Sequence, residues 1–420
     1  MTDPQAATRP GLRFGGGDVL ALTLLLAPPV AIYASAGIAL LAIMAALAII
    51  ALNALNRRWP DIGAKTVLAA LILVAVWGAV SALWSIRPDE SLKRALQLAG
   101  IFLAGGILLG AAQDLDDGQR KRVAMAAVAG IALALALVFF ERLTGGALRR
   151  LFEPGVEAPL SAMNRASTLL VLLSSAPAAY LWRDGRHAGV IALVVGVGAA
   201  AFALESASAR VAWGVAVTAA ILAWFLPRLT VALLAIGVAA SILLAPVAVS
   251  LLPNPDPRNV ERRAHLPPSA AHRALIWHYA AGKIDERPLW GWGLDASRSL
   301  PDARAMIPWD MGPQPPGAPR YATIVLMPLH PHNAPLQWRL ELGLPGALLG
   351  TGVALLALAS VERAAIGRAE RAGALALLAA GLTVAVISYG AWQSWWLLGL
   401  FLAAAGMAAV SRRASSGKPA

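Results

Sequence analysis

The polar stretch between residues 330 and 341 carries the side chains best suited to chemistry. It holds His330 and His332, followed by Asn333, Gln337 and Glu341, and it stands at the mouth of a long apolar run. Polar and ionisable groups at a membrane boundary are costly without partners, so such a cluster predicts a functional site. A histidine that stays neutral near pH 7 can serve there as a general base.

Helix-start geometry favours His332 over His330 as that base. Asn333 can N-cap a helix in whose first turn Pro335 is tolerated. His332 then lies at the positive end of the helix, which disfavours an imidazolium. Gln337 and Glu341 are four residues apart and share one face, and we expect the deeper Glu341 to meet an arginine. The alternative is that His332 is a hydrogen-bonded loop histidine.

Composition defines the elements that must position this stretch. The chain has 420 residues, 58% of them hydrophobic and 14% charged, with a mean hydropathy of +0.66. This predicts an all-α polytopic membrane protein. Crossing about 30 Å of hydrocarbon takes roughly 20 apolar residues, and about twelve runs approach that length. The predicted spans are 18–34, 36–54, 65–84, 94–112, 122–140, 165–182, 187–204, 210–227, 229–252, 335–360, 372–389 and 391–411.

These spans divide the chain into four parts. Nine spans fall within residues 1–252, a loop domain with short helices covers 253–334, three spans fall within 335–411, and 412–420 form a tail. With a cytoplasmic N-terminus, the inner loops carry about twice as many Lys and Arg as the short outer loops, as the positive-inside rule requires. Both termini are therefore predicted inside and the long loop outside.

The same charge pattern bears on partners and cofactors. A net charge of +12 in short loops between apolar runs indicates topology control, so no nucleic-acid partner is expected. Cysteine is absent, so disulfides and thiolate metal sites are excluded. The histidines lack a shared helix face and a clear carboxylate partner, so no metal is expected either.

Two short outer segments could contribute to the site. Asn164 and Arg165 open the sixth span, where N-capping by Asn164 is the simpler explanation. Arg210 lies in a tight turn at a helix start, where a cation is unfavourable unless an anion is close. Glu205 could supply that anion, or Arg210 could bind a ligand phosphate.

The long loop adds an arginine and an aromatic residue. Its apolar spacing predicts a helix over 270–284, with Arg273 and Trp277 on one face. Arg273 either stacks on the indole or points into the site, with Trp277 packing against a sugar ring. The Pro-rich stretch 301–329 predicts an extended loop without much regular structure.

The order of these residues resembles the O-antigen ligase and polymerase superfamily over roughly residues 160–350. The single large outer loop and the length are more similar to the lipopolysaccharide ligases than to the longer protein-glycosylating members. The matching pieces are Asn164-Arg165 at a span start, Ser208-Ala209-Arg210, Arg273-x-x-x-Trp277, Gly291-x-Gly293, His332-Asn333 with Gln337 and Glu341, and Gly343-x-x-Gly346.

This resemblance implies a glycosyltransferase of the bacterial inner membrane, with its site on the periplasmic face. It would transfer O-antigen polysaccharide from undecaprenyl pyrophosphate to a sugar hydroxyl of lipid A–core, with inversion and without metal or cofactor. The other expected partners are membrane lipids, and the chain is expected to act as a monomer. His332 would be the general base, Arg210 and Arg273 would bind the pyrophosphate, and Trp277, Asn333, Gln337, Glu341, Asn164 and Arg165 would complete the substrate site.

Three alternatives stay open. A polymerase of the same superfamily would use the same donor with another polysaccharide as acceptor, and a protein O-oligosaccharyltransferase would use a protein hydroxyl. A transporter or flippase would need polar groups spread through several spans. Spans such as 187–204 are almost devoid of them, which favours a site at one surface.

Overall fold

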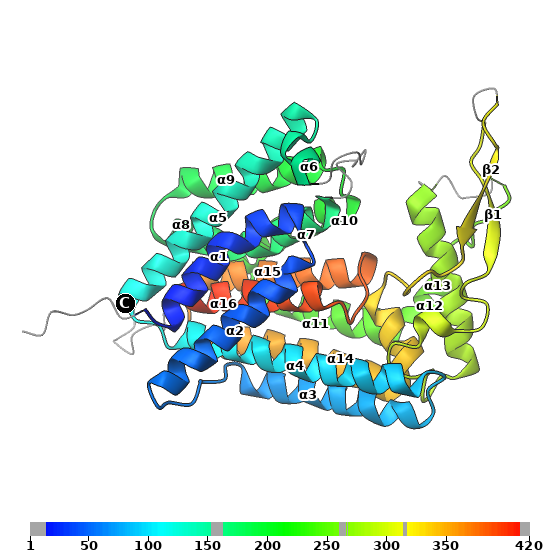
Figure 1. Cartoon of the computed structure of the whole chain (residues 1–420), viewed down its shortest axis with the longest axis horizontal. Helices are drawn as coiled ribbons and strands as arrows, with labels where there is room; N and C mark the ends of the chain where they lie inside the picture. The colour runs from blue at the N-terminus through cyan, green and yellow to red at the C-terminus, as the bar shows by residue number, and fades with distance from the viewer. Residues whose placement is uncertain (1–13, 153–162, 260–265, 267, 314–316, 412–420) are drawn as a thin grey trace, which may run out of the picture.

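The computed structural model describes residues 14–152, 163–259, 266, 268–313 and 317–411, and helices dominate it (Figure 1). The chain is an all-α polytopic membrane protein with one small β-hairpin, as the sequence predicts. The helices are α1 Gly16–Tyr33, α2 Gly37–Leu55, α3 Lys65–Val80, α4 Pro88–Gln113, α5 Asp117–Thr144, α6 Ala147–Phe152, α7 Asn164–Leu173, α8 Ser175–Arg183, α9 His187–Ala203, α10 Ala207–Phe225, α11 Pro227–Leu243, α12 Ala245–Ser250, α13 Pro268–Glu286, α14 Ala334–Arg363, α15 Arg368–Ile387 and α16 Ser394–Val410.

A helix or a pair of helices covers each of the twelve predicted spans, but the count of twelve is not confirmed. Within the described ranges, eight helices are long and apolar enough to cross a membrane, namely α1 to α5, α10, α14 and α15. The apolar helices α9, α11 and α16 are shorter. The sixth span divides at Ser174 and the ninth at Leu244. Pro177 and Pro246 follow these breaks, and proline has no N–H to continue the helical hydrogen bonds.

If successive spans cross the membrane in alternating directions, the loops on one side of the membrane all lie at one end of the bundle. We call the end that carries residues 253–334 the loop face, and it holds α12, α13 and the hairpin on the right of Figure 1. At this face the Ile86 N–H donates to the Trp292 carbonyl (3.4 Å), and Ser208 Oγ lies 3.0 Å from Ser388 Oγ. At the opposite face, the Arg183 guanidinium lies 2.9 Å from the Glu370 carboxylate.

The loop segment packs directly onto the start of α14. Ile276, Ala280 and Ile284 of α13 form a buried apolar cluster that also includes Leu336 and Leu340 of α14. This second core is distinct from the main one in the bundle. It fixes α13 above the first turns of α14, which are the turns that follow the histidines.

The prediction of little regular structure over residues 301–329 is wrong. Strands β1 (Met306–Asp310) and β2 (Tyr321–Val325) pair in an antiparallel hairpin, with Met306 opposite Val325 and Asp310 opposite Tyr321. Ile307 and Trp309 in β1, and the residues Tyr321, Thr323, Ile324 and Val325 in β2, favour the pleated conformation over the extended loop that the prolines suggested.

Helix α14 is kinked at Gly343, the first glycine of the Gly343-x-x-Gly346 motif. Gly343 has φ +64° and ψ −157°, and a Cβ there would lie 2.1 Å from the Leu289 carbonyl oxygen. The interruption frees backbone carbonyls that must find other donors. Trp292 N–H donates to Leu340 O (2.9 Å), Gly293 N–H to Glu341 O (2.8 Å) and Trp77 Nε1–H to Leu342 O (3.0 Å).

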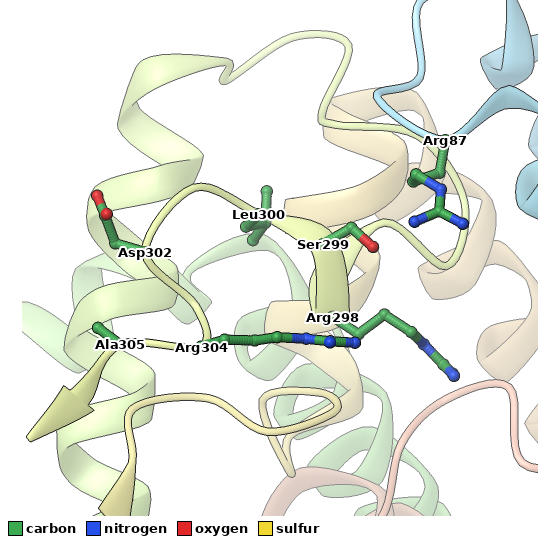
Figure 2. Close-up of a pocket in the computed structure, with 7 residues that line it drawn as sticks. All are labelled: Arg87, Arg298, Ser299, Leu300, Asp302, Arg304 and Ala305. Atoms are coloured by element: carbon green, nitrogen blue, oxygen red, sulfur yellow. The ribbon is translucent and has the colours of Figure 1, made fainter.

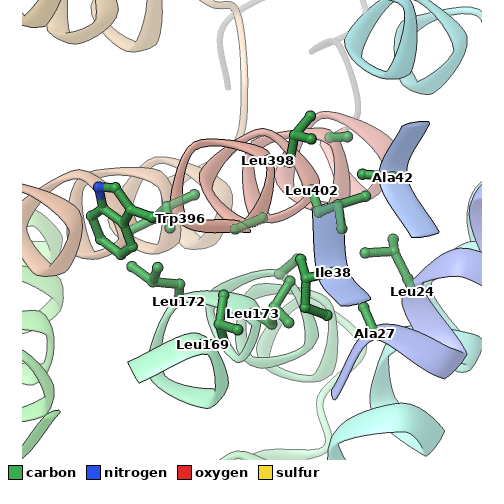
Figure 3. Packing of buried hydrophobic residues seen from close by; sticks show 14 of the residues in the cluster. Leu24, Ala27, Ile38, Ala42, Leu169, Leu172, Leu173, Trp396, Leu398 and Leu402 are labelled. Carbon is green, nitrogen blue, oxygen red and sulfur yellow. The ribbon is translucent and has the colours of Figure 1, made fainter. Parts of the chain in front are cut away.

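The interior of the bundle is apolar where the C-terminal helix passes through it. Helix α16 contacts α2, α4, α5, α7 and α8. Figure 3 shows Trp396, Leu398 and Leu402 of α16 among side chains of α1, α2 and α7, namely Leu24, Ala27, Ile38, Ala42, Leu169, Leu172 and Leu173. This packing gathers apolar side chains at the centre and leaves the polar groups to the two ends.

Candidate functional site

His332 lies immediately before α14 in a conformation that few non-glycine residues adopt. Its φ is +56°, and its backbone N–H donates to His330 Nδ1 (3.1 Å). The two imidazole ring centres are 4.3 Å apart. Asn333 caps α14 through its Oδ1, which accepts the Leu336 N–H (3.0 Å), so the predicted cap is confirmed.

One hydrogen bond determines which nitrogen of His332 carries the proton. Its Nδ1 lies 2.8 Å from the Ser388 carbonyl oxygen. A carbonyl can only accept, so Nδ1 is protonated and Nε2 keeps its lone pair. Burial lowers the pKa of His332, and the charges of Arg273 and His272 act in the same direction, whereas the Ser388 bond opposes them. The geometry is that of a neutral general base with Nε2 as the acceptor.

His330 is held in the complementary tautomer. Its Nδ1 accepts the His332 N–H, so its Nε2 carries the proton. That Nε2 lies 3.1 Å from the Gln393 amide nitrogen, while Gln393 Oε1 is buried with no partner among the described residues. Exchanging the oxygen and nitrogen of this amide satisfies both groups. His330 then supports the backbone of His332 instead of reacting.

The environment keeps His330 neutral. Burial lowers the pKa of His330 to about 3, and the charges of His332, Arg298 and Arg165 add to the effect. Gly390 permits this burial, because a Cβ there would lie within 2.8 Å of the imidazole. A neutral His330 can accept the His332 N–H throughout the physiological pH range.

Glu341 is fully buried below the histidines and is surrounded by neutral donors. The prediction that an arginine pairs with Glu341 is wrong among the residues that the structure describes. The kink at Gly343 instead brings the turn that follows Gly293 against the carboxylate. Its donors are the N–H of Asp295 (2.6 Å), the N–H and hydroxyl of Ser297, Gln337 Nε2 (3.0 Å) and Trp392 Nε1 (2.6 Å).

Gln337 and Glu341 connect α14 to the loop between α15 and α16. Gln337 Oε1 accepts the Ala391 N–H (2.8 Å), beside the Trp392 bond to Glu341. The same loop presents the Ser388 carbonyl to His332 and the Gln393 amide to His330. Gln337 and Glu341 therefore position the loop that bonds the histidines.

Helix α13 brings Arg273 and Trp277 to the histidine segment. Arg273 Nη1 donates to the Ile387 carbonyl (2.8 Å), one residue before Ser388. Burial lowers the pKa of Arg273, an effect that the nearby Tyr389 opposes. The Trp277 Nε1–H donates to the Pro331 carbonyl (2.8 Å), between the two histidines. Both side chains therefore bond backbone carbonyls beside the histidines.

Asn164 and Arg165 lie on the α7 side of the same site. Arg165 is exposed, and its guanidinium lies 5.5 Å from the centre of the Trp395 ring. Tyr389 stands edge-on to that ring at 4.7 Å and donates to the Asn164 carbonyl (3.4 Å). N-capping by Asn164 is wrong, because Met163 occupies the cap position and Asn164 already has helical backbone. Its Oδ1 is buried with no partner among the described residues.

Arg210 is directed away from the histidines. Ser208 of the same helix faces Ser388, and two residues further along an α-helix lie about 200° around its axis. Arg210 accordingly donates to the Ala201 and Phe202 carbonyls at the end of α9, at 3.4 and 3.2 Å, rather than pairing with Glu205. The structure therefore brings together every predicted site residue except Arg210.

The sequence prediction missed the segment from Ser388 to Trp395, which comprises the loop after α15 and the first turn of α16. Ser388, Tyr389, Trp392 and Trp395 contact predicted site residues, and Gln393 contacts His330. A signal was present, because this polar and aromatic stretch interrupts two apolar runs. An alternating topology also places it on the side of the histidines.

No candidate metal site is present among the residues that the structure describes. They contain no group of three or more His, Asp or Glu side chains that could hold an ion. Metal-independent chemistry stays a prediction.

The apolar helical bundle defines a polytopic membrane protein, and histidine, arginine and aromatic side chains gather at one end of it. Comparison with known proteins shows which protein families this chain resembles. Residues 191–350 match the family described as O-antigen ligase. This range contains Arg210, Arg273, His332 and Glu341, and it excludes Arg165 and the 388–395 loop.

Similar proteins occur in Rickettsia. The chain is 27% identical to a "Putative polysaccharide ligase" of Rickettsia felis over 336 residues, which cover 80% of this chain and 78% of that one. It is 28% identical to a protein of the same name in Rickettsia bellii over 330 residues, 78% of this chain and 76% of that one. The chain is therefore similar to the O-antigen ligase family over residues 191–350 and to these proteins over most of its length.

Proposed function

We propose that this protein is an O-antigen ligase that transfers a polysaccharide from a polyprenyl pyrophosphate carrier to a sugar hydroxyl. The observation that carries the proposal is the protonation pattern of His332. Its Nδ1 is committed to the Ser388 carbonyl, and Nε2 is left to accept a proton beside Arg273. Similarity to the O-antigen ligase family and to a polysaccharide ligase supports this reaction class.

The proposed reaction is a single displacement at the anomeric carbon. His332 Nε2 removes the proton of the acceptor hydroxyl while its oxygen bonds to the anomeric carbon. The bond from that carbon to the pyrophosphate oxygen breaks, and the electron pair leaves with the lipid pyrophosphate. One displacement inverts the configuration, and the imidazolium returns its proton to solvent.

Arginines would stabilise the negative charge that grows on the leaving pyrophosphate. Arg273 is the first candidate, because it is half-buried next to His332 and has no carboxylate partner among the described residues. Arg165 is the second, since it is exposed over Trp395 and its charge acts on His330. Arg210 contacts α9, so we assign it to the rim of the donor site instead of the centre.

The remaining predicted residues would position the reacting groups. Gln337 and Glu341 would hold the loop that bonds both histidines, and Asn333 would fix the start of α14. Trp277 would orient the histidine segment through Pro331, and the ring face of Trp277 remains a candidate surface for a sugar. Asn164 would contribute its unpaired Oδ1 as an acceptor for a sugar hydroxyl.

The substrates and the membrane sidedness are part of the proposal. We assign the donor as undecaprenyl-pyrophosphate-linked O-antigen and the acceptor as lipid A–core. We place the loop face in the periplasm and both termini in the cytoplasm of a bacterial inner membrane. The excess of Lys and Arg in the segments of the opposite face supports this orientation.

The test is the glycan profile of cells that lack the protein. Loss of a ligase should leave long polymers on the lipid carrier and none on lipid A–core. Loss of a polymerase would instead leave single repeat units attached to lipid A–core. Equal amounts of attached long polymer with and without the protein would rule out both activities.

A further inference from the structure

A pocket of about 370 Å³ opens on the loop face beside the histidine site (Figure 2). Three separate segments build it: the residue that precedes α4, the 3-10 turn Ser297–Ser299, and the turn that leads into β1. The lining residues are Arg87, Arg298, Ser299, Leu300, Asp302, Arg304 and Ala305.

The residues that line the pocket carry more positive than negative charge. It contains three arginines and one aspartate, a formal balance of +2. Arg304 has no carboxylate within 4 Å among the described residues, and Arg87 reaches only the half-exposed Glu90 at 3.9 Å. Like charges in one pocket repel unless an anion lies between them.

Arg298 is also incompletely satisfied. Its Nη2 reaches Asp295 at 3.2 Å, but Asp295 is shared with Arg94, which is closer at 2.9 Å. The Arg298 Nε is buried with no partner among the described residues. A buried N–H group without an acceptor is costly, so this guanidinium has capacity for a further acceptor.

The side chains in Figure 2 show where such an acceptor would fit. Arg298 and Arg304 extend in the same direction, and Arg87 reaches toward them from the start of α4. The Asp302 carboxylate points away from the three guanidinium groups. The carboxylate in the lining therefore does not occupy the space that an anion would take.

The pocket is distinct from the position assigned to the pyrophosphate. Its lining includes neither Arg273 nor Arg165, the two arginines assigned to the pyrophosphate. Arg273 instead contacts the Ile387 carbonyl, and Arg165 lies over the Trp395 ring. The donor brings one pyrophosphate, which Arg273 would bind, so a second anion must belong to the other substrate.

We propose that the Arg87, Arg298 and Arg304 pocket binds a phosphate group on the acceptor glycan. The inference rests on the proposed function for the identity of that substrate. A phosphate monoester carries close to two negative charges near neutral pH and accepts paired hydrogen bonds from guanidinium groups. It matches both the formal charge of the lining and the unpaired Nε of Arg298.

Binding of the free anion can be measured without any transfer reaction. The probe is inorganic phosphate, titrated by calorimetry into the purified full-length protein in detergent. The test variant is the double substitution Arg87→Ala with Arg304→Ala, because both side chains are on the surface and α4 begins with its own acidic first turn. The control is Arg142→Ala, an exposed arginine in the last turn of α5.

The expected result is about tenfold weaker phosphate binding in the double variant. The control should bind like the wild type, and Arg273→Ala should keep the binding that the double variant loses. Unchanged phosphate binding in a double variant with a normal unfolding temperature would show that this pocket is not the phosphate site.

Steady-state transfer then identifies the substrate that carries the phosphate. The double variant should raise the KM of a phosphorylated acceptor about tenfold and leave the KM of the same acceptor unchanged after phosphatase treatment. A rise in the KM of the donor instead would overturn the acceptor assignment. Phosphate binding in the pocket of a protein that transfers no glycan would refute the proposed function and leave the anion site standing.

Discussion

Individual arginines at the two ends of the bundle are used in opposite ways. At the opposite face, Arg183 lies 2.9 Å from Glu370, and Arg120 donates to the Ala408, Ala409 and Ser411 carbonyls near the end of α16. At the loop face, Arg273 contacts one carbonyl, and Arg304 has no carboxylate partner among the described residues.

The buried carboxylates differ in the same way. Glu370 is paired with an arginine, whereas Glu341 is satisfied by backbone, hydroxyl, amide and indole donors. Glu341 is thus stabilised without a cation, and Arg273 and Arg304 stay available for an external anion. Other acids of the loop face do use arginine, because Asp295 pairs with Arg94 (2.9 Å) and Asp310 with Arg320 (3.1 Å). Matched arginines stabilise the fold, and unmatched arginines in a half-buried setting indicate a binding site.

The largest effect should come from removing the proposed base. His332→Ala is expected to lower the transfer rate by about 10² to 10⁴, because a positioned proton acceptor contributes that much. The rate of glycan transfer by purified protein would measure it. His278→Ala is the matched control, since His278 bonds only carbonyls at the start of the loop. Transfer by the His332 variant within threefold of wild type would remove the base assignment.

A pair of arginine substitutions tests the contrast between the two ends directly. Arg273→Ala should reduce transfer at least about tenfold with little change in unfolding temperature, because it removes charge stabilisation of the leaving group. Arg183→Ala should instead destabilise the fold by about 3 kcal/mol, because it leaves Glu370 buried without its partner. Thermal unfolding and transfer per folded protein would separate them, and equal effects of both variants would invalidate the contrast.

The pH dependence of transfer should report the buried state of His332. Its lowered pKa keeps the imidazole neutral to a pH below the ordinary histidine value of about 6.5, so the acid limb of the rate should lie below that pH. Stability should also fall as the pH drops below about 6.5, because the unfolded chain then binds protons that the buried histidines do not. An acid limb above pH 7 would contradict this environment.

The smallest effect is expected at the supporting histidine. His330→Ala should lower kcat about tenfold, because the His332 N–H loses its acceptor and the left-handed backbone loses its support. His330→Asn offers a short side-chain acceptor and should recover part of the loss, with the acid limb of the pH profile unchanged. Recovery by Ala as complete as by Asn would show that the hydrogen bond does not position His332.

Much of the candidate site follows from local sequence. The Asn333 cap and the helix that carries Arg273 and Trp277 depend on residues a few positions apart, and the structure bears both of them out. The hairpin was missed because prolines obscured the strand-forming residues of β1 and β2. The direction of Arg210 was missed because it depends on which side of α10 packs against α15.

The sequence by itself determined the class of protein, the positions of the apolar runs and the place of His332 before a helix. These properties depend on hydrophobic length and on capping, which act within a few turns of chain. Only the tertiary structure decided that Ser388 fixes the His332 tautomer and that neutral donors satisfy Glu341. It also decided that Arg87 and Arg304 line the same pocket. Those partners are separated by tens to hundreds of residues, and only the packing of the helices brings them within reach of one another.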